Sequence, residues 1–182
     1  MTREELTALL TGPFFEHFAD IVAARVLADG DFAALYESAT DIPESFPTAL
    51  RHRMAFRGAY AVERIYFIAP DTFAPYVPRF CQQDFPACTD AGARRSFAKI
   101  MAHLLRDVVL DAETLDRIAE TAAQWAIDPK TKIAVRIWCV ELLRLCRERC
   151  SWVGEMWDDL LETLKHDASP AIACRMRGVW RR

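Results

Sequence analysis

The chain has 182 residues, of which 27% are charged and 52% hydrophobic, and this composition excludes disordered, collagen-like and low-complexity proteins. Its length suits a single domain, and its net charge of −3 gives no overall positive field for nucleic acid or anionic membranes. No stretch approaches the roughly 18 apolar residues of a membrane span, and the acidic N-terminus does not resemble a secretory signal. We therefore expect a cytoplasmic protein.

The charge is unevenly distributed along the chain. Residues 1–91 hold 7 basic and 13 acidic residues, whereas residues 92–182 hold 16 basic and 13 acidic residues. The second half therefore offers more positive charge to a partner.

The N-terminal residues predict two short helices. Thr2 and Glu5 have the spacing of a capping box, and the helix that they open should end before Gly12-Pro13. Apolar residues at intervals of three and four then run from Phe14 to Leu27, before Asp29-Gly30-Asp31 stops the pattern. Residues 40–48 contain two prolines and form the linker candidate. We expect residues 1–45 to be a divergent N-terminal cap.

Helical periodicity continues through the rest of the chain, without strand-like alternation. The expected helices are 48–68, 71–85, 91–109, 112–126, 130–148, 152–166 and 169–181. Four sites have residues that commonly cap or begin a helix, namely Asp111, Ser151, Asp128-Pro129 and Ser169-Pro170. The connections are short, so consecutive helices should form antiparallel hairpins.

An internal repeat emerges when the helices at 48–68, 91–109, 130–148 and 169–181 are aligned. The alignment superposes four arginines at intervals of 38, 41 and 39 residues, namely Arg57, Arg95, Arg136 and Arg175. A period near 39 with two helices per unit is typical of HEAT and armadillo solenoids. We expect an all-α, right-handed α-α superhelix of about four hairpins over residues 46–182, in preference to an irregular helical bundle.

Residues 50–182 resemble HEAT-like repeats. Three stretches are similar to a family of short bacterial HEAT-like proteins, namely Arg57–Arg64, Phe73–Phe80 and Ile133–Val140. The resemblance implies the helical-repeat fold and no particular activity, because the matching residues are those that build the solenoid. Some such proteins carry an adenylosuccinate lyase label, but the lyase loop resembling S-S-x-M-P-x-K-x-N is missing here.

The aligned arginines have two interpretations. In the first they form a structural ladder with Asp90, Asp128 and Asp167, because bidentate arginine–aspartate pairs fix the geometry of neighbouring repeats. In the second, further basic residues complete a groove for an acidic peptide or nucleic acid, and Arg177 extends it. The candidate residues are Arg57, Arg95, Lys99, Arg106, Arg136, Arg144, Arg147 and Arg175. We favour the ladder for the aligned arginines.

Apolar residues at helical spacing predict the buried faces. One face comprises Phe97, Ile100, Met101, Leu104, Leu105 and Val108, and the equivalent face one unit later comprises Ile137, Trp138, Leu142 and Leu145. Trp125 and Trp138 should therefore be core residues, whereas Trp180 could cap the last repeat or contact a partner. Cys139, Cys146 and Cys150 share one helical face, which favours reduced, buried cysteines.

Catalytic and cofactor motifs are missing from the sequence. The four histidines lack ligand spacing, and no nucleotide-binding or nucleophile-elbow motif occurs. The acidic stripe of Glu155, Asp158, Asp159 and Glu162 is typical of a solvated helix face. We predict a non-enzymatic protein- or peptide-binding scaffold without a cofactor or metal. The alternative is a nucleic-acid-binding or DNA-repair-related protein that uses the basic second half, although the Trp and Asp of HEAT-like glycosylases have no match here.

Overall fold

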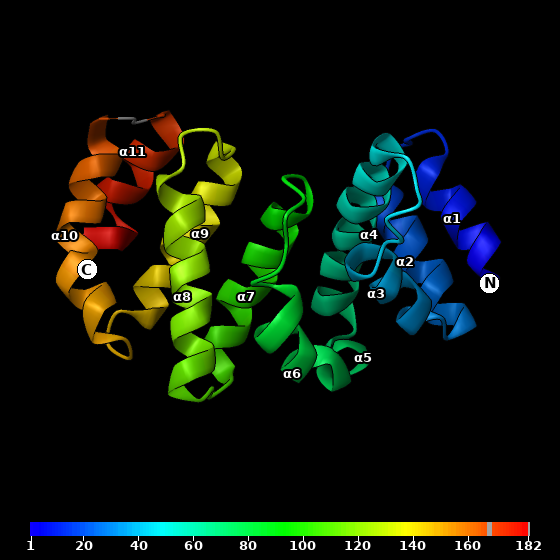
Figure 1. The fold of residues 1–182 in the computed structure, drawn as a ribbon, viewed down its shortest axis with the longest axis horizontal. Coiled ribbons are helices and arrows are strands. Elements are labelled where there is room, and N and C mark those ends of the chain that lie inside the picture. Colours follow the sequence, from blue (N-terminus) through cyan, green and yellow to red (C-terminus); the bar gives the residue numbers. More distant parts are fainter. Residues whose placement is uncertain (167–168, 182) are drawn as a thin grey trace. The chain divides into compact units, whose positions relative to one another are not determined.

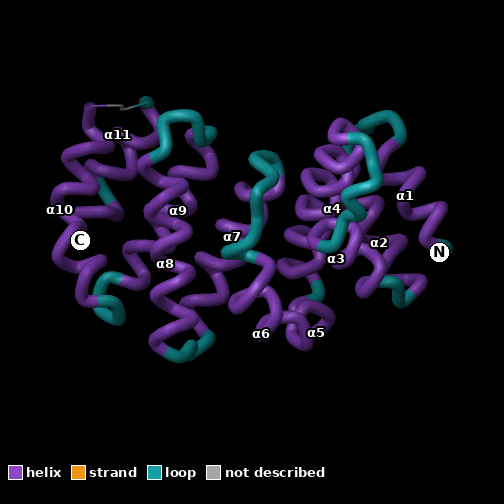
Figure 2. Tube along the Cα trace, in the orientation of Figure 1, coloured by secondary structure: helices purple, strands orange, loops and turns teal. Residues whose placement is uncertain are grey.

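The computed structural model describes residues 1–166 and 169–181, and within them every regular element is a helix (Figure 2). The all-α fold class is therefore confirmed for these residues. The chain divides into two compact units, Met1–Phe97 and Ala98–Arg182. None of the described helices is long and apolar enough to span a bilayer.

The first unit is organised around the long helix α4. The helices α1, α2 and α3 each pack against it (Figure 1). Their bounds are Arg3–Thr11 for α1, Phe18–Asp29 for α2, Phe32–Thr40 for α3 and Thr48–Ile68 for α4. Gly58 permits the close approach of α3 to α4, since a Cβ at this position would lie 3.0 Å from the Ala39 Cβ.

The N-terminal helix signals are confirmed. The Thr2 side chain accepts a hydrogen bond from the Glu5 amide at 3.1 Å, and the Glu5 carboxylate accepts one from the Thr2 amide at 2.8 Å. Gly30 ends α2 with a left-handed φ of 71°, which a glycine adopts without strain. Helix α2 begins at Phe18 rather than near Phe14, and the sequence interpretation did not identify α3.

The single helix expected over 71–85 is wrong, because the segment is a chain of short helical turns. These turns are α5 (Pro70–Phe73), the 3₁₀ turn η1 (Ala74–Tyr76), α6 (Val77–Arg79) and the π-helical turn η2 (Phe80–Asp84). Pro75 and Pro78 explain the interruption, since neither can donate a backbone hydrogen bond and each ring disfavours the preceding helical turn.

The second unit contains most of α7 and the remaining helices. Their bounds are Ala93–Asp107 for α7, Ala112–Ile127 for α8, Ile133–Cys146 for α9, Ser151–His166 for α10, Pro170–Arg177 for α11 and Val179–Arg181 for the 3₁₀ turn η3. Helices α8 and α9 form an extensively packed hairpin (Figure 1). Helix α11 packs against both α10 and η3.

Two of the four predicted helix starts are confirmed. The Asp111 side chain accepts from the Thr114 amide at 2.8 Å, and the Ser169 side chain accepts from the Ile172 amide at 3.3 Å. The start at Asp128-Pro129 is wrong, since α9 begins only at Ile133 and Asp128 follows the end of α8. Ser151 is the first residue of α10 itself.

The core of the first unit is rich in aromatic rings that meet edge to face. The Phe73 ring lies 5.4 Å from the Phe80 ring and 6.0 Å from the Tyr36 ring, and the Phe80 ring lies 5.3 Å from the Phe97 ring. The predicted face around Phe97 is confirmed, except that Val108 is only half-buried. This core joins η2 to the first turns of α7.

The buried face of α9 differs from the predicted one. Leu142 is buried, but Ile137, Trp138 and Leu145 are only half-buried. The residues that α9 buries instead are Val135, Arg136, Cys139, Val140, Glu141, Leu142, Leu143 and Cys146. Compared with the prediction, α9 is thus rotated about its own axis, and Trp138 lies partly at the surface.

The predicted burial of Cys139, Cys146 and Cys150 is confirmed. Burial raises the pKa of the Cys146 thiol to about 12 and that of the Cys150 thiol to about 11. Both therefore stay protonated and poorly nucleophilic at neutral pH.

Candidate binding surface in the second unit

The eight candidate basic residues lie in different settings. Arg57 belongs to the first unit, where its Nη1 donates to the carbonyl oxygens of Leu10 at 2.9 Å and Gly12 at 2.6 Å. Its guanidinium also lies over the rings of Phe14 and Phe18, at 5.3 and 5.6 Å from their centroids. Arg57 therefore holds the C-terminal end of α1 against α4.

Arg95 and Arg136 also contact groups other than the predicted aspartates. Arg95 Nη1 donates to the buried Glu63 carboxylate at 3.2 Å, within the first unit. Arg136 is 4% exposed, and its Nε donates to the Ala126 carbonyl oxygen at 2.8 Å, at the end of α8. Both arginines thus join neighbouring elements, as a ladder would.

The predicted aspartate partners of the ladder are wrong for Asp90 and Asp128. Asp90 accepts from the Gly92 and Ala93 amides, both at 2.9 Å, and lies 2.6 Å from His52 Nδ1. Asp128 accepts from the Lys130 amide at 2.9 Å. A short side chain next to a helix end satisfies nearby amides more readily than a distant guanidinium. The third proposed partner, Asp167, lies outside the described residues.

Arg147 and Arg175 are separate from the remaining candidates. Arg147 lies 5.8 Å from the Trp157 ring centroid and lines a cavity of about 410 Å³ next to α10 and η3. Arg175 is half-buried on α11. The structure therefore does not gather all eight residues into one groove.

Three of the candidates do meet on one surface of the second unit. Lys99 and Arg106 lie on α7, and Arg144 lies on α9. Lys99 Nζ is 5.9 Å from the Trp138 ring centroid, and the His103 ring is 6.0 Å from the same ring. We call Lys99, His103, Arg106, Trp138 and Arg144 the cation–aromatic face. The spacing of 99, 103 and 106 places these residues on one side of α7.

A buried carboxylate anchors this face. Glu141 is 4% exposed and accepts from Arg144 Nη2 at 2.9 Å and Nε at 3.3 Å, while Arg106 Nη2 lies 3.7 Å away. The buried Trp180 indole also donates to Glu141, at 3.3 Å. The hydrogen bonds hold Arg144 in place at the surface, and the ion pair keeps Arg106 close to the same carboxylate.

The pKa of His103 reflects the charges on this face. Burial lowers the pKa of His103, and the nearby charges of Arg106 and Lys99 lower it further. Asp107 and Glu141 oppose this shift without cancelling it. The imidazole is therefore surrounded by net positive charge.

Arg106 and Arg144 remain accessible to an anionic ligand. The side chains of Arg106 and Arg144 are 47% and 30% exposed, although both approach Glu141. Arg144 uses Nε and Nη2 for Glu141, which leaves Nη1 without a partner among the described residues. A carboxylate could accept from these donors, while an apolar side chain could pack on Trp138.

Sequence reasoning identified the three basic residues but missed His103, Glu141 and the surface position of Trp138. Within residues 1–166 and 169–181, no group of three His, Cys, Asp or Glu side chains could hold a metal ion. The acidic stripe from Glu155 to Glu162 is exposed, as predicted. Comparisons with protein-family models, curated protein sequences and solved structures give no match to this chain.

Proposed function

We propose that this protein is a non-enzymatic binding scaffold of the HEAT or armadillo type, and that its cation–aromatic face binds an acidic segment of a partner protein. The observation that carries the proposal is that Lys99 lies beside the half-buried Trp138, while Arg106 and Arg144 pair with Glu141 one turn further along α9. Helical-repeat proteins commonly bind partners on surfaces formed by successive helices.

Contacts between residues about one repeat apart support the helical-repeat fold. In the first unit His52 pairs with Asp90 across 38 residues of sequence. In the second unit Trp180 donates to Glu141 across 39 residues. Stacked repeats bring equivalent positions together in this way, and the period near 39 is the one found in the sequence. We propose the right-handed superhelix on this basis.

The chemistry of the face favours an acidic ligand. Lys99 and His103 lie beside Trp138, and Arg106 and Arg144 share the buried Glu141 carboxylate. The Glu141 bonds hold the Arg144 guanidinium in place before a ligand arrives, so binding would cost less side-chain entropy. An acidic segment with a neighbouring apolar residue fits both the charges and the ring.

Nucleic-acid binding is the alternative, and the tryptophan positions favour it less. Trp125, Trp157 and Trp180 are buried, and the Trp152 indole donates to Asp116 at 3.1 Å. Trp138 alone lies beside the cations of the face, whereas single-stranded nucleic acid is usually bound by several stacking rings along a basic track.

The test is direct binding of a short poly-glutamate peptide that ends in leucine, followed by tryptophan fluorescence and calorimetry. We expect saturable binding that weakens as the salt rises above about 100 mM, because the contacts are ionic. Lys99→Glu should weaken binding about tenfold, since it replaces an attraction by a repulsion. Trp138→Phe should remove most of the fluorescence change, which locates the peptide.

Lys130→Glu is the matched control, because it makes the same charge change at an exposed lysine of the same unit. It should leave peptide affinity within about twofold of the wild type. Equal losses in Lys99→Glu and Lys130→Glu would mean that only overall charge matters. Tight binding of a labelled single-stranded oligonucleotide without peptide binding would replace the proposal by its alternative.

A further inference from the structure

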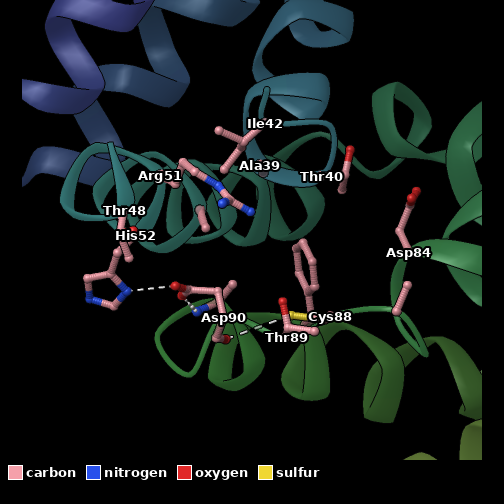
Figure 3. A pocket seen from close by; sticks show the side chains of 14 residues that line it. Ala39, Thr40, Ile42, Thr48, Arg51, His52, Asp84, Cys88, Thr89 and Asp90 are labelled. Atoms are coloured by element: carbon pink, nitrogen blue, oxygen red, sulfur yellow. Dashed lines mark hydrogen bonds and ion pairs between the residues drawn. The ribbon is translucent and has the colours of Figure 1, made fainter. Parts of the chain in front are cut away.

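The first unit contains a cavity of about 440 Å³ that no part of the proposed function uses. It lies between the C-terminal end of α3, the first turns of α4, the segment 84–90 and the start of α7 (Figure 3). Its volume falls in the ordinary range for small-molecule sites, and its lining mixes apolar and polar side chains. All of its lining residues belong to the first unit.

The acidic groups at the edges of the cavity are already bound by protein donors. Asp84 accepts from the Tyr36 hydroxyl at 2.6 Å and pairs with Arg79 at 3.1 Å. Asp90 accepts from two backbone amides and pairs with His52 (Figure 3). Both carboxylates therefore have partners within the protein, and neither pairs with Arg51.

Arg51 is the basic residue of the cavity lining that has no partner among the described residues. Its side chain extends from α4 into the cluster of lining residues (Figure 3) and is half-buried. The guanidinium makes no hydrogen bond or ion pair with any described residue, whereas Arg57, Arg79 and Arg95 of the same unit all have such partners. A half-buried guanidinium that lacks a partner retains five donors for an anion.

The rest of the lining is uncharged. Ala39, Ala55, Ala93 and Phe97 are buried and form an apolar floor. Burial raises the pKa of the Cys88 thiol to about 12, so Cys88 is neutral here. The Thr48 and Thr89 hydroxyls are exposed within the lining and can add hydrogen bonds.

We propose that this cavity is a binding site for a small amphipathic carboxylate, with the carboxylate on Arg51 and the apolar body against Phe97 and the neighbouring alanines. Planar, bidentate pairing with a guanidinium suits a carboxylate. The apolar floor explains why an acid with a hydrocarbon body should bind better than a small inorganic anion. This site is independent of the cation–aromatic face, which lies in the other unit.

Hexanoate is the probe that tests this site, with acetate, inorganic phosphate and 1-hexanol as comparisons. Binding to the full chain is followed by backbone amide shifts, which distinguish the cavity from the cation–aromatic face. We expect hexanoate to shift amides of the lining residues saturably and to bind about tenfold more tightly than each of the other probes. Acetate and phosphate lack the apolar body, and 1-hexanol lacks the charge.

Two substitutions and one control complete the test. Arg51→Gln should weaken hexanoate binding about tenfold and leave 1-hexanol binding unchanged. Ala87→Leu should weaken both, because Ala87 is an exposed lining residue and a larger side chain would occupy the cavity. Arg53→Gln makes the same charge change on α4 at an exposed residue outside the lining and should bind like the wild type.

Three results would overturn the proposal. The first is wild-type affinity for hexanoate in the Arg51→Gln variant. The second is binding of phosphate or 1-hexanol as tight as that of hexanoate. The third is a titration with hexanoate in which no amide of the lining residues shifts. None of these results affects the proposal for the acidic peptide, because binding of that peptide is measured by the fluorescence of Trp138.

Discussion

The two units use their basic residues differently. In the first unit Arg57, Arg79 and Arg95 join one helical element to another through carbonyl oxygens or carboxylates. In the second unit Lys99 lies beside the half-buried Trp138 ring, while Arg106 and Arg144 pair with the buried Glu141. Arginines that stand one repeat apart in the sequence can thus have unrelated partners.

This comparison indicates that the role of a basic residue depends on the acceptors around it rather than on its position within the repeat. Arg57 and Arg136 both donate to backbone oxygens at the end of a preceding helix, where carbonyl groups lack helical partners. Arg95 and Arg144 instead bind buried glutamates. The experiments below test these interactions and the charges around His103, in order of decreasing effect on stability.

The largest effect is expected at Glu141. Glu141→Ala removes the acceptor of Arg144 and leaves the buried Trp180 indole N–H without a hydrogen bond to this carboxylate. The unsatisfied buried indole N–H costs about 1–3 kcal/mol and the loss of the Arg144 pair adds to it, so we expect the free energy of unfolding to fall by about 2–3 kcal/mol. Chemical denaturation followed by tryptophan fluorescence measures this change.

Glu148→Ala is the control for this experiment, because Glu148 is an exposed glutamate close to the end of α9. Its effect should stay within about 0.5 kcal/mol. Glu141→Gln should fall between the two, since an amide oxygen can still accept from Trp180. Equal stability of Glu141→Ala and Glu148→Ala would show that Glu141 does not anchor the face.

The helices with strong local signals could be predicted from the sequence. Helix α4 has the predicted bounds of 48–68, and Ser169-Pro170 opens α11 as expected. Helix α3 was missed because it is short and lies between a glycine turn and a proline-rich linker. The apolar periodicity of 71–85 predicts a single helix, whereas the prolines inside this segment divide it into short turns.

The candidate site was harder to predict than the helices. The positions of Lys99, Arg106 and Arg144 follow from helical spacing, but the rotation of α9 that exposes Trp138 depends on tertiary packing. Arg136 and Glu141 are both buried on that helix, against the usual preference of charged residues for the surface. Arg136 donates to the end of α8 and Glu141 accepts from Trp180 of η3, so of these contacts only the Glu141–Arg144 pair follows from the local spacing.

A smaller effect is expected at Arg57. Arg57→Gln removes the contacts with the Leu10 and Gly12 carbonyl oxygens and the cation over Phe14. We expect a loss of about 1–2 kcal/mol in the free energy of unfolding, measured by chemical denaturation. Arg25→Ala should cost less than about 0.5 kcal/mol, because its approach to Glu5 is an exposed, long ion pair. A loss no larger than that of Arg25→Ala would place Arg57 among ordinary surface arginines.

The smallest effect, and the one that most directly tests the face, concerns the protonation of His103. Its pKa is lowered in the folded protein by burial and by Arg106 and Lys99, so the unfolded chain binds the proton more readily. Stability should therefore decrease as the pH falls below the unfolded value of about 6.5, and His103→Gln should reduce this dependence. Chemical denaturation at about pH 7.5 and about pH 5.5 measures it.

The same histidine reports on the ligand. An acidic peptide on the cation–aromatic face would bring negative charge close to His103 and raise its pKa, as would Lys99→Gln by removing a positive charge. Binding would then take up a proton, so the peptide should bind more tightly as the pH falls toward 5.5. A titration of the His103 ring by NMR measures both shifts. A pKa that rises in Lys99→Gln but not with bound peptide would place the peptide away from this face.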